Sequence, residues 1–274
     1  MHSAVLHCLL LISLNQLDVG QLSATNGAVD LISGTAGINV SGTIQGDNGF
    51  IALAQQDIVT NEITSSQAAA ILKSSQGAVT VNGSVTANGD ASLAAAGNVK
   101  VDEVTSQDSS VALVSATGVV NLEGAISSME DVTVASAQSL TINQEIEAEL
   151  GSIALGSTEG SVTTSVAIDS AIGVNISAKQ NVSTKRIRTY GGDVVIDAQQ
   201  GTTTIGGVIN SRGGDIRVSG FNTVRTKNII SRSGDVSIIS DTSLVRTGYI
   251  RTDRGNRILI VISCLHLFPT KIIL

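Results

Sequence analysis

The sequence predicts an all-β fold, a right-handed, single-stranded parallel β-helix (β-solenoid) of about 11–12 coils of about 21 residues each. A pair of apolar residues, separated by one residue, recurs along the chain, and ten repeats span the 207 residues from Val29 to Val236. The composition points the same way, since aromatic residues make up 2% of the chain, Trp is absent and Pro occurs once. Aromatic rings normally fill the core of a globular domain, so this core must be narrow and aliphatic.

Each repeat contains three short segments that alternate apolar and other residues, as in β-strands with one buried side. The first segment carries the recurring pair, at Leu10/Ile12, Val29/Leu31, Ile51/Leu53, Ala70/Leu72, Ala91/Leu93, Val111/Leu113, Val132/Val134, Ile153/Leu155, Val174/Ile176, Val194/Ile196, Ile216/Val218, Val236/Ile238 and Ile258/Ile260. A second segment follows five to seven residues later, for example at 38–40, 79–81 and 99–101. A third apolar position comes next, at Ile44, Val85, Val104, Ile126, Ile146, Ile187, Ile209, Ile229 and Ile250. Gly, Asn, Asp or Ser then turns the chain into the following coil.

We expect residues 10–260 to form one solenoid domain, with irregular segments at 1–9 and 261–274. Stacking at the usual strand spacing of about 4.8 Å buries the apolar side that a single coil leaves exposed. Neither end carries the polar cap that shields the last coil of a solenoid, so we expect either further repeats of a longer parent protein or a gene with degraded ends. No stretch of 18 consecutive apolar residues occurs, so we expect no transmembrane segment.

The residue types that most catalytic and metal sites need are confined to the ends of the chain. The histidines are His2, His7 and His266, and the cysteines are Cys8 and Cys264. The coils therefore hold no Ser-His-Asp triad, no Cys-His pair and no zinc ligand set. The glycines recur with the coil and form no phosphate-binding loop. We expect the chain not to be an enzyme and to hold no metal or cofactor.

Three aspartates leave two interpretations open. Asp193, Asp215 and Asp235 occupy the same place in successive coils, each just after a glycine. A ladder of carboxylates could bind calcium between coils. Alternatively, each side chain accepts a hydrogen bond from a backbone N–H at a corner, which is the interpretation we favour.

Charge is divided unevenly along the chain. Residues 1–178 contain 17 acidic residues and two lysines, a net charge of −15, whereas residues 179–274 contain 14 basic and six acidic residues, a net charge of +8. The two ends of a rod would then face different partners or neighbours.

Four arginines of the basic part are candidate ligand-binding residues. Arg212 and Arg232 share one position of the repeat, and Arg188 and Arg251 share another. Stacking turns repeated charge into a stripe, which could bind acidic glycans or an anionic cell surface. The other interpretation, which we favour, is a solvated charged surface that deters aggregation. Binding to nucleic acid is not expected, because few aromatic rings are present for base stacking.

The last coils carry a family resemblance. The segment GDVVIDA at 192–198 recurs as GDIRVS at 214–219 and GDVSII at 234–239, with TTTIGGVINSRG and TVRTKNIISRS between them. This pattern resembles the filamentous-haemagglutinin-like repeats of bacterial exoproteins and adhesins, over roughly residues 10–260. The resemblance implies a β-helical rod that is secreted or displayed at the cell surface and attaches to host or bacterial cells, glycans or matrix.

The main functional hypothesis is therefore a structural and adhesive segment of a large secreted or cell-surface repeat protein. One alternative is a passive spacer rod that binds nothing. Another is a carbohydrate-active enzyme similar to polysaccharide lyases, for which Asp193, Asp215, Asp235 and Arg217 are the available residues. Repeats of 19–22 residues leave no long loop to form the wall of a substrate cleft, which argues against the enzyme.

Overall fold

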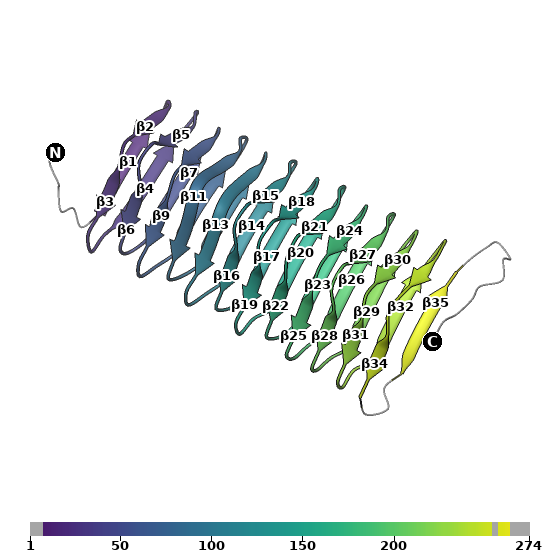
Figure 1. Cartoon of the computed structure of the whole chain (residues 1–274). Coiled ribbons are helices and arrows are strands. Elements are labelled where there is room, and N and C mark those ends of the chain that lie inside the picture. The colour runs from purple at the N-terminus through teal and green to yellow at the C-terminus, as the bar shows by residue number, and fades with distance from the viewer. Residues whose placement is uncertain (1–7, 254–256, 264–274) are drawn as a thin grey trace.

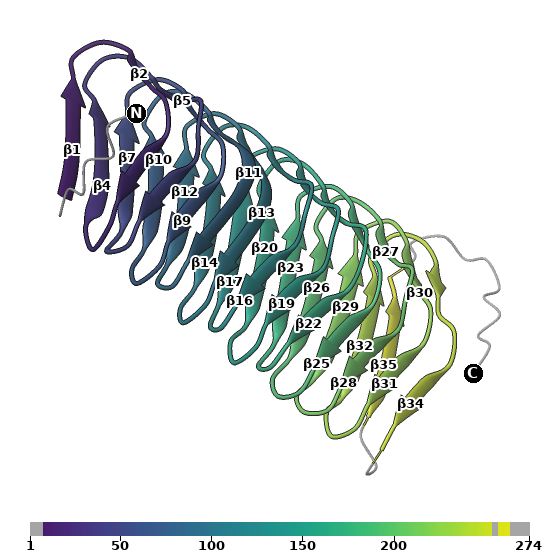
Figure 2. The same ribbon diagram turned by 60° about the vertical axis from the view of Figure 1, so that its left-hand side comes forward.

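The computed structural model describes residues 8–253 and 257–263, which form 35 β-strands and no helix. The strands pair in parallel with their counterparts in the next coil, so the coils stack into a rod (Figure 1). The view turned by 60° shows the same stack with its separate strand layers (Figure 2). A parallel β-solenoid is thus confirmed. Of the segments expected to be irregular, 1–7 and 264–274 lie outside the described residues, while β1 begins at Cys8 and β35 ends at Ile262.

The first strand of every coil belongs to one 13-stranded sheet, called the long sheet here. Its strands, in spatial order, are β1 (Cys8–Ser13), β4 (Ala28–Ser33), β7 (Phe50–Ala54), β10 (Ala70–Ser74), β12 (Ala91–Ala95), β14 (Val111–Ser115), β17 (Val132–Ser136), β20 (Ile153–Ser157), β23 (Val174–Ala178), β26 (Val194–Ala198), β29 (Ile216–Gly220), β32 (Val236–Ser240) and β35 (Ile258–Ile262). Twelve coils are therefore complete, and β35 starts a thirteenth, in agreement with the predicted number.

The other strands form two further layers. The middle strands are β2 (Leu17–Val19), β5 (Ile38–Val40), β8 (Ile58–Thr60), β15 (Val120–Leu122), β18 (Leu140–Ile142), β21 (Val162–Thr164), β24 (Val182–Thr184), β27 (Thr203–Ile205), β30 (Val224–Thr226) and β33 (Val245–Arg246). The third strands are β3 (Leu22–Ala24), β6 (Ile44–Gly46), β9 (Ile63–Ser65), β16 (Ile126–Ser128), β19 (Ile146–Ala148), β22 (Ile168–Ser170), β25 (Ile187–Thr189), β28 (Ile209–Ser211), β31 (Ile229–Ser231) and β34 (Ile250–Thr252). In two coils the middle and third strands are continuous, as β11 (Val79–Ala87) and β13 (Val99–Ser106).

Two of the predicted apolar pairs are wrong by one residue. In β7 the inward side chains are Phe50 and Ala52, because Phe50 pairs with Val29, while Leu53 points outward and is 37% exposed. In β1, Leu9 and not Leu10 pairs with Val29. Both strands contain consecutive apolar residues, so alternation alone leaves their register undetermined and the neighbouring strands decide it.

The core is a stack of aliphatic ladders. Leu31, Leu72, Leu93 and Leu113 occupy equivalent positions and are fully buried, as is Phe50. Each ladder places a side chain against those of the coils before and after it, which removes apolar surface from water at every step. The third ladder includes Ile63 and Ile168, which the repeat pattern missed.

Buried serines close two of the three corners. They end the strands of the long sheet, as Ser115 does, and the third strands, as Ser231 does. The Ser115 hydroxyl donates to the Gly97 carbonyl (2.6 Å) and accepts from the Gly118 amide (3.0 Å). The Ser231 hydroxyl bonds both backbone groups of Gly234. Small hydroxyl side chains thereby satisfy backbone groups that a tight turn would leave unpaired.

Candidate functional site

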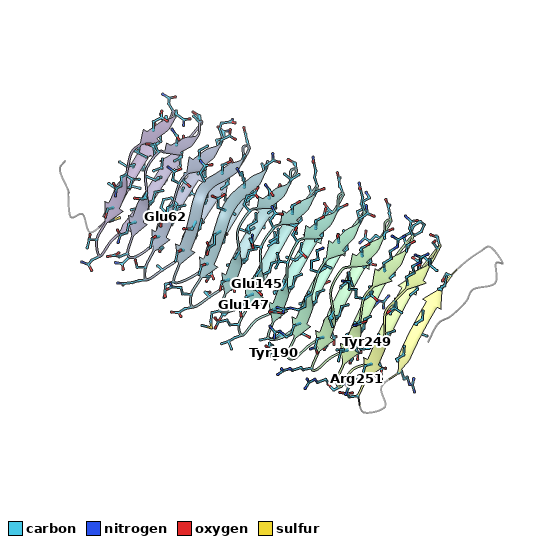
Figure 3. All side chains as sticks on the ribbon, viewed as in Figure 1. Glu62, Glu145, Glu147, Tyr190, Tyr249 and Arg251 are labelled. Atoms are coloured by element: carbon cyan, nitrogen blue, oxygen red, sulfur yellow. The ribbon has the colours of Figure 1, made fainter. Side chains whose placement is uncertain are left out.

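The basic part of the rod has a corner, called the basic corner here, where the third strands β25, β28, β31 and β34 end and turn. It contains Arg188, Tyr190, Arg212, Arg232, Arg251 and Asp253. Figure 3 labels Tyr190 and Arg251 along one edge of the rod, with Glu145 and Glu147 further along the same edge. Arg188 and Arg251 share one position of the repeat, as predicted, because the pairing of the third strands puts them in one outward ladder. Arg212 and Arg232 share another, since each directly follows a strand-ending serine, Ser211 or Ser231, and these two serines are paired.

Arg188 is held by an aspartate of the preceding coil. Asp169 in β22 pairs with Arg188 in β25, and its side chain is only 11% exposed. The Arg188 guanidinium donates to both carboxylate oxygens of Asp169, at 3.3 and 2.7 Å, and Arg186 donates to Oδ2 at 3.0 Å. The pKa of Arg188 is raised above its usual value, chiefly by its hydrogen bond to Asp169. This pairing orients Arg188 but neutralises much of its attraction for an external anion.

Tyr190 lies directly after β25, and its ring contacts Arg212 of the next coil. The Arg212 guanidinium carbon lies 4.6 Å from the centre of the Tyr190 ring, and that of Arg188 lies 5.6 Å from it. The contact with an aromatic face restricts the guanidinium without consuming its charge, at a stabilisation of about 0.5–1 kcal/mol for an exposed pair. Arg212 therefore remains available to an anionic ligand.

Arg232 follows Arg212 by one coil, at a spacing of about 4.8 Å along the rod. Within the described residues, its guanidinium makes no hydrogen bond or ion pair. A shallow hollow of about 350 Å³ is lined by Arg212, Arg232, Ser233 and Asp253. Arg251 Nε lies 3.0 Å from Asp253 Oδ1, so this carboxylate of the hollow is paired, while Arg212 and Arg232 form no ion pair with any described residue.

The three turn aspartates serve the backbone. Oδ1 of Asp193 accepts from the Asp215 amide (2.7 Å), and Oδ1 of Asp215 accepts from the Asp235 amide (2.8 Å). In the same way, Oδ1 of Asp235 accepts a hydrogen bond from the Arg257 amide, at 2.8 Å. In the part of the chain that the structure describes, no three His, Cys, Asp or Glu side chains are grouped closely enough to hold a metal ion. The geometry favours the turn interpretation over a calcium ladder.

Sequence reasoning missed the partners that shape the basic corner. It named the four arginines, but not Asp169, Tyr190 or Asp253 as their neighbours. Counting by the repeat would have found them, since Tyr190 precedes Arg212 by 22 residues and Asp253 follows Arg232 by 21. The ion pair between Arg251 and Asp253 lies within a single turn.

Comparison with protein families, with curated proteins and with solved structures finds no match to this chain. Among residues 8–253 and 257–263 no helix could cross a membrane.

Proposed function

We propose that this chain is a structural and adhesive rod, a segment of a secreted or cell-surface protein of the bacterial adhesin type, that binds an acidic polysaccharide at its basic corner. The observation that carries the proposal is the pair of free guanidinium groups of Arg212 and Arg232, one coil apart beside a shallow hollow. A polyanion carries charge at regular intervals, and a stack of coils presents cations at regular intervals.

The four arginines have different roles in this proposal. Arg188 and Arg251 are each paired with an aspartate, so they shape the corner and add little net charge. Arg212 and Arg232 contact the ligand. Because such exposed contacts are each weak, useful affinity requires a ligand that engages both guanidinium groups at once.

Binding of heparin, a sulfated polysaccharide, tests the proposal. The double variant Arg212→Glu/Arg232→Glu is expected to raise the dissociation constant about tenfold or more, because it replaces attraction with repulsion at the hollow. Affinity of the unaltered chain is expected to fall as salt increases from about 0.05 to 0.3 M, since the contacts are exposed. Calorimetry or surface plasmon resonance measures both effects, with neutral dextran as the negative ligand.

The matched control is Arg225→Glu/Arg246→Glu, which makes the same change of charge at two exposed arginines in adjacent middle strands. This variant is expected to keep its affinity within about threefold. Equal loss of affinity in both double variants would show that heparin is attracted to the whole basic part, residues 179–274, and absence of heparin binding would overturn the proposal.

A further inference from the structure

The outer face of the long sheet differs from the other two faces of the rod. At its two central outward positions most residues are apolar, namely Leu10, Ile12, Ile32, Ile51, Leu53, Ile71, Ala94, Ala112, Val114, Ala135, Ala154, Val195, Ile239, Leu259 and Val261. By contrast, the central residues of the middle and third strands that the structure describes are polar or charged except Val59 and Ile230. The rod is therefore amphipathic in cross-section. We call the two outward rows of the long sheet the apolar face.

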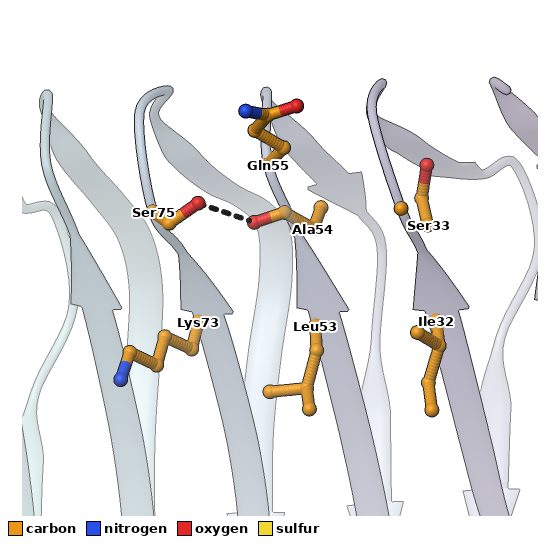
Figure 4. A pocket seen from close by; sticks show the side chains of 8 residues that line it. Ile32, Ser33, Leu53, Ala54, Gln55, Lys73 and Ser75 are labelled. Carbon is orange, nitrogen blue, oxygen red and sulfur yellow. Dashed lines mark hydrogen bonds between the residues drawn. The ribbon is translucent and has the colours of Figure 1, made fainter. Parts of the chain in front are cut away.

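The apolar face has shallow hollows, and several of its large side chains are exposed to solvent. One hollow on it is lined by Ile32, Leu53 and Lys73, which project side by side from successive strands (Figure 4). A second hollow lies further along the same face, beside Ala135 and Ala154. Leu10, Ile12, Leu53, Val114 and Leu259 are each between 37% and 65% exposed. The apolar residues are concentrated from β1 to β17, while β23 (Asn175, Ser177) and β29 (Arg217, Ser219) contribute none. An exposed apolar patch that spans several strands marks an interaction site.

Charged residues on the apolar face are few and have a symmetric arrangement. Among its described positions they are Asp30 on the second strand of the long sheet, Lys73 on the fourth, Asp197 on the tenth and Arg217 on the eleventh. Asp30 and Arg217 lie in one row, because the register of the long sheet relates them, and Lys73 and Asp197 lie in the other. Each row thus has one acid and one base, at opposite ends.

We propose that two copies of this chain associate through the apolar face, in antiparallel orientation. A two-fold axis runs along the strand direction between β14 and β17. It places β4, the second strand of the long sheet in one copy, opposite β29, the eleventh strand, in the other. Asp30 then faces the Arg217 side chain of the second copy. Lys73 comes within one strand spacing, about 4.8 Å, of Asp197, a gap that a lysine side chain spans. The interface is isologous, so each ion pair occurs twice.

The size of the apolar face suits such a pair. Ten strands at about 4.8 Å, each about 17 Å wide, give roughly 800 Å² per copy, the area buried by each partner in a typical stable interface. Near the two-fold axis the outward side chains are the small Ala112, Val114, Thr133 and Ala135, which let the two sheets approach to the usual distance of about 10 Å. The side chains of Asp30, Lys73 and Arg217 make no hydrogen bond or ion pair within the described residues, so their charges are available to a second copy.

Sedimentation velocity of the full chain over a range of concentrations tests the proposal. A monomer–dimer equilibrium is expected. Val114→Arg, which places a charge near the two-fold axis, is expected to yield monomer at concentrations where the unaltered chain is dimeric. Ser127→Arg puts the same residue on the outward position of β16 in the same coil and is expected to leave the dimer intact. Circular dichroism of both variants reports whether each remains folded.

A charge exchange tests the orientation. Asp30→Arg and Arg217→Asp are each expected to raise the dimer dissociation constant about tenfold, since each puts like charges opposite one another. The double variant is expected to return it to within about threefold of the unaltered value. Monomer at every concentration, dimer retained by Val114→Arg, or no recovery in the double variant would each overturn the proposal.

Discussion

At the scale of single residues, close contact between coils restricts several glycines. A β-carbon on Gly234 would lie well inside van der Waals contact of the Gly214 carbonyl in the coil before it, and both groups are backbone, so neither can rotate away. Gly214 itself has a φ of +68°, which only glycine adopts without cost. The turn after the third strand therefore requires glycine for two reasons. Gly234 leaves space for the backbone of the preceding coil, and Gly214, in that preceding coil, adopts a positive φ.

Gly234→Ala is accordingly expected to lower the free energy of unfolding by about 1–3 kcal/mol, because the turn must shift and break contacts with the next coil. Urea denaturation measures the effect. Gly156→Ala is the control, since no atom lies within 4 Å of its added methyl group, and it is expected to be neutral or to stabilise by up to about 1 kcal/mol. An equal loss in both variants would mean that backbone contact between coils does not set the effect.

At the scale of strands, the position of a side chain along the rod decides how much its burial contributes. Leu11 and Leu113 belong to one inward ladder of the long sheet. Leu113 in β14 is fully buried between two neighbouring coils. Leu11 in β1 pairs with β4 and is only partly buried.

Leu113→Ala is expected to cost about 2–5 kcal/mol through lost burial and an unfilled cavity. Leu11→Ala is expected to cost less than about 1.5 kcal/mol, because Leu11 is only partly buried and β1 pairs with one strand among the described residues. Hydrogen exchange followed by mass spectrometry locates the effect, with faster exchange spreading over several coils around β14 in the first variant and confined to β1 and β4 in the second. Similar global losses would show that the rod unfolds as one unit.

At the scale of the whole molecule, the rod carries its surfaces on different sides. The acidic part occupies the coils up to residue 178, and the basic corner follows it along the axis. The apolar face lies on the long sheet, and the basic corner lies along the edge of that sheet, at the turns that join the third strands to it. The antiparallel arrangement sends the two basic corners to opposite ends of the pair, which would let one dimer bridge two anionic surfaces.

Small-angle X-ray scattering distinguishes this dimer from rods joined end to end. Twelve spacings of about 4.8 Å give the described coils an axial length of about 58 Å. The antiparallel dimer is expected to double the mass and enlarge the cross-section with little change in this length. An approximate doubling of the maximum dimension on dimerisation would instead place the contact at the ends of the rod.

The sequence by itself determined the repeat, the three strands per coil, the aliphatic core and the shared positions of the four arginines. All of these follow from periodicity, because a stack of equivalent coils copies each residue onto the same side of the rod. Tertiary structure alone decided the register of β1 and β7, where consecutive apolar residues fit either face until β4 fixes the pairing. It also decided which arginines are free. The repeat places Asp169 and Tyr190 one coil before Arg188 and Arg212, but only the side-chain distances show that Asp169 forms an ion pair with Arg188, whereas Tyr190 gives Arg212 an aromatic contact that leaves its charge unpaired. Periodicity identifies the neighbours at about 4.8 Å, and the side-chain conformations within that spacing decide which neighbours bind each other.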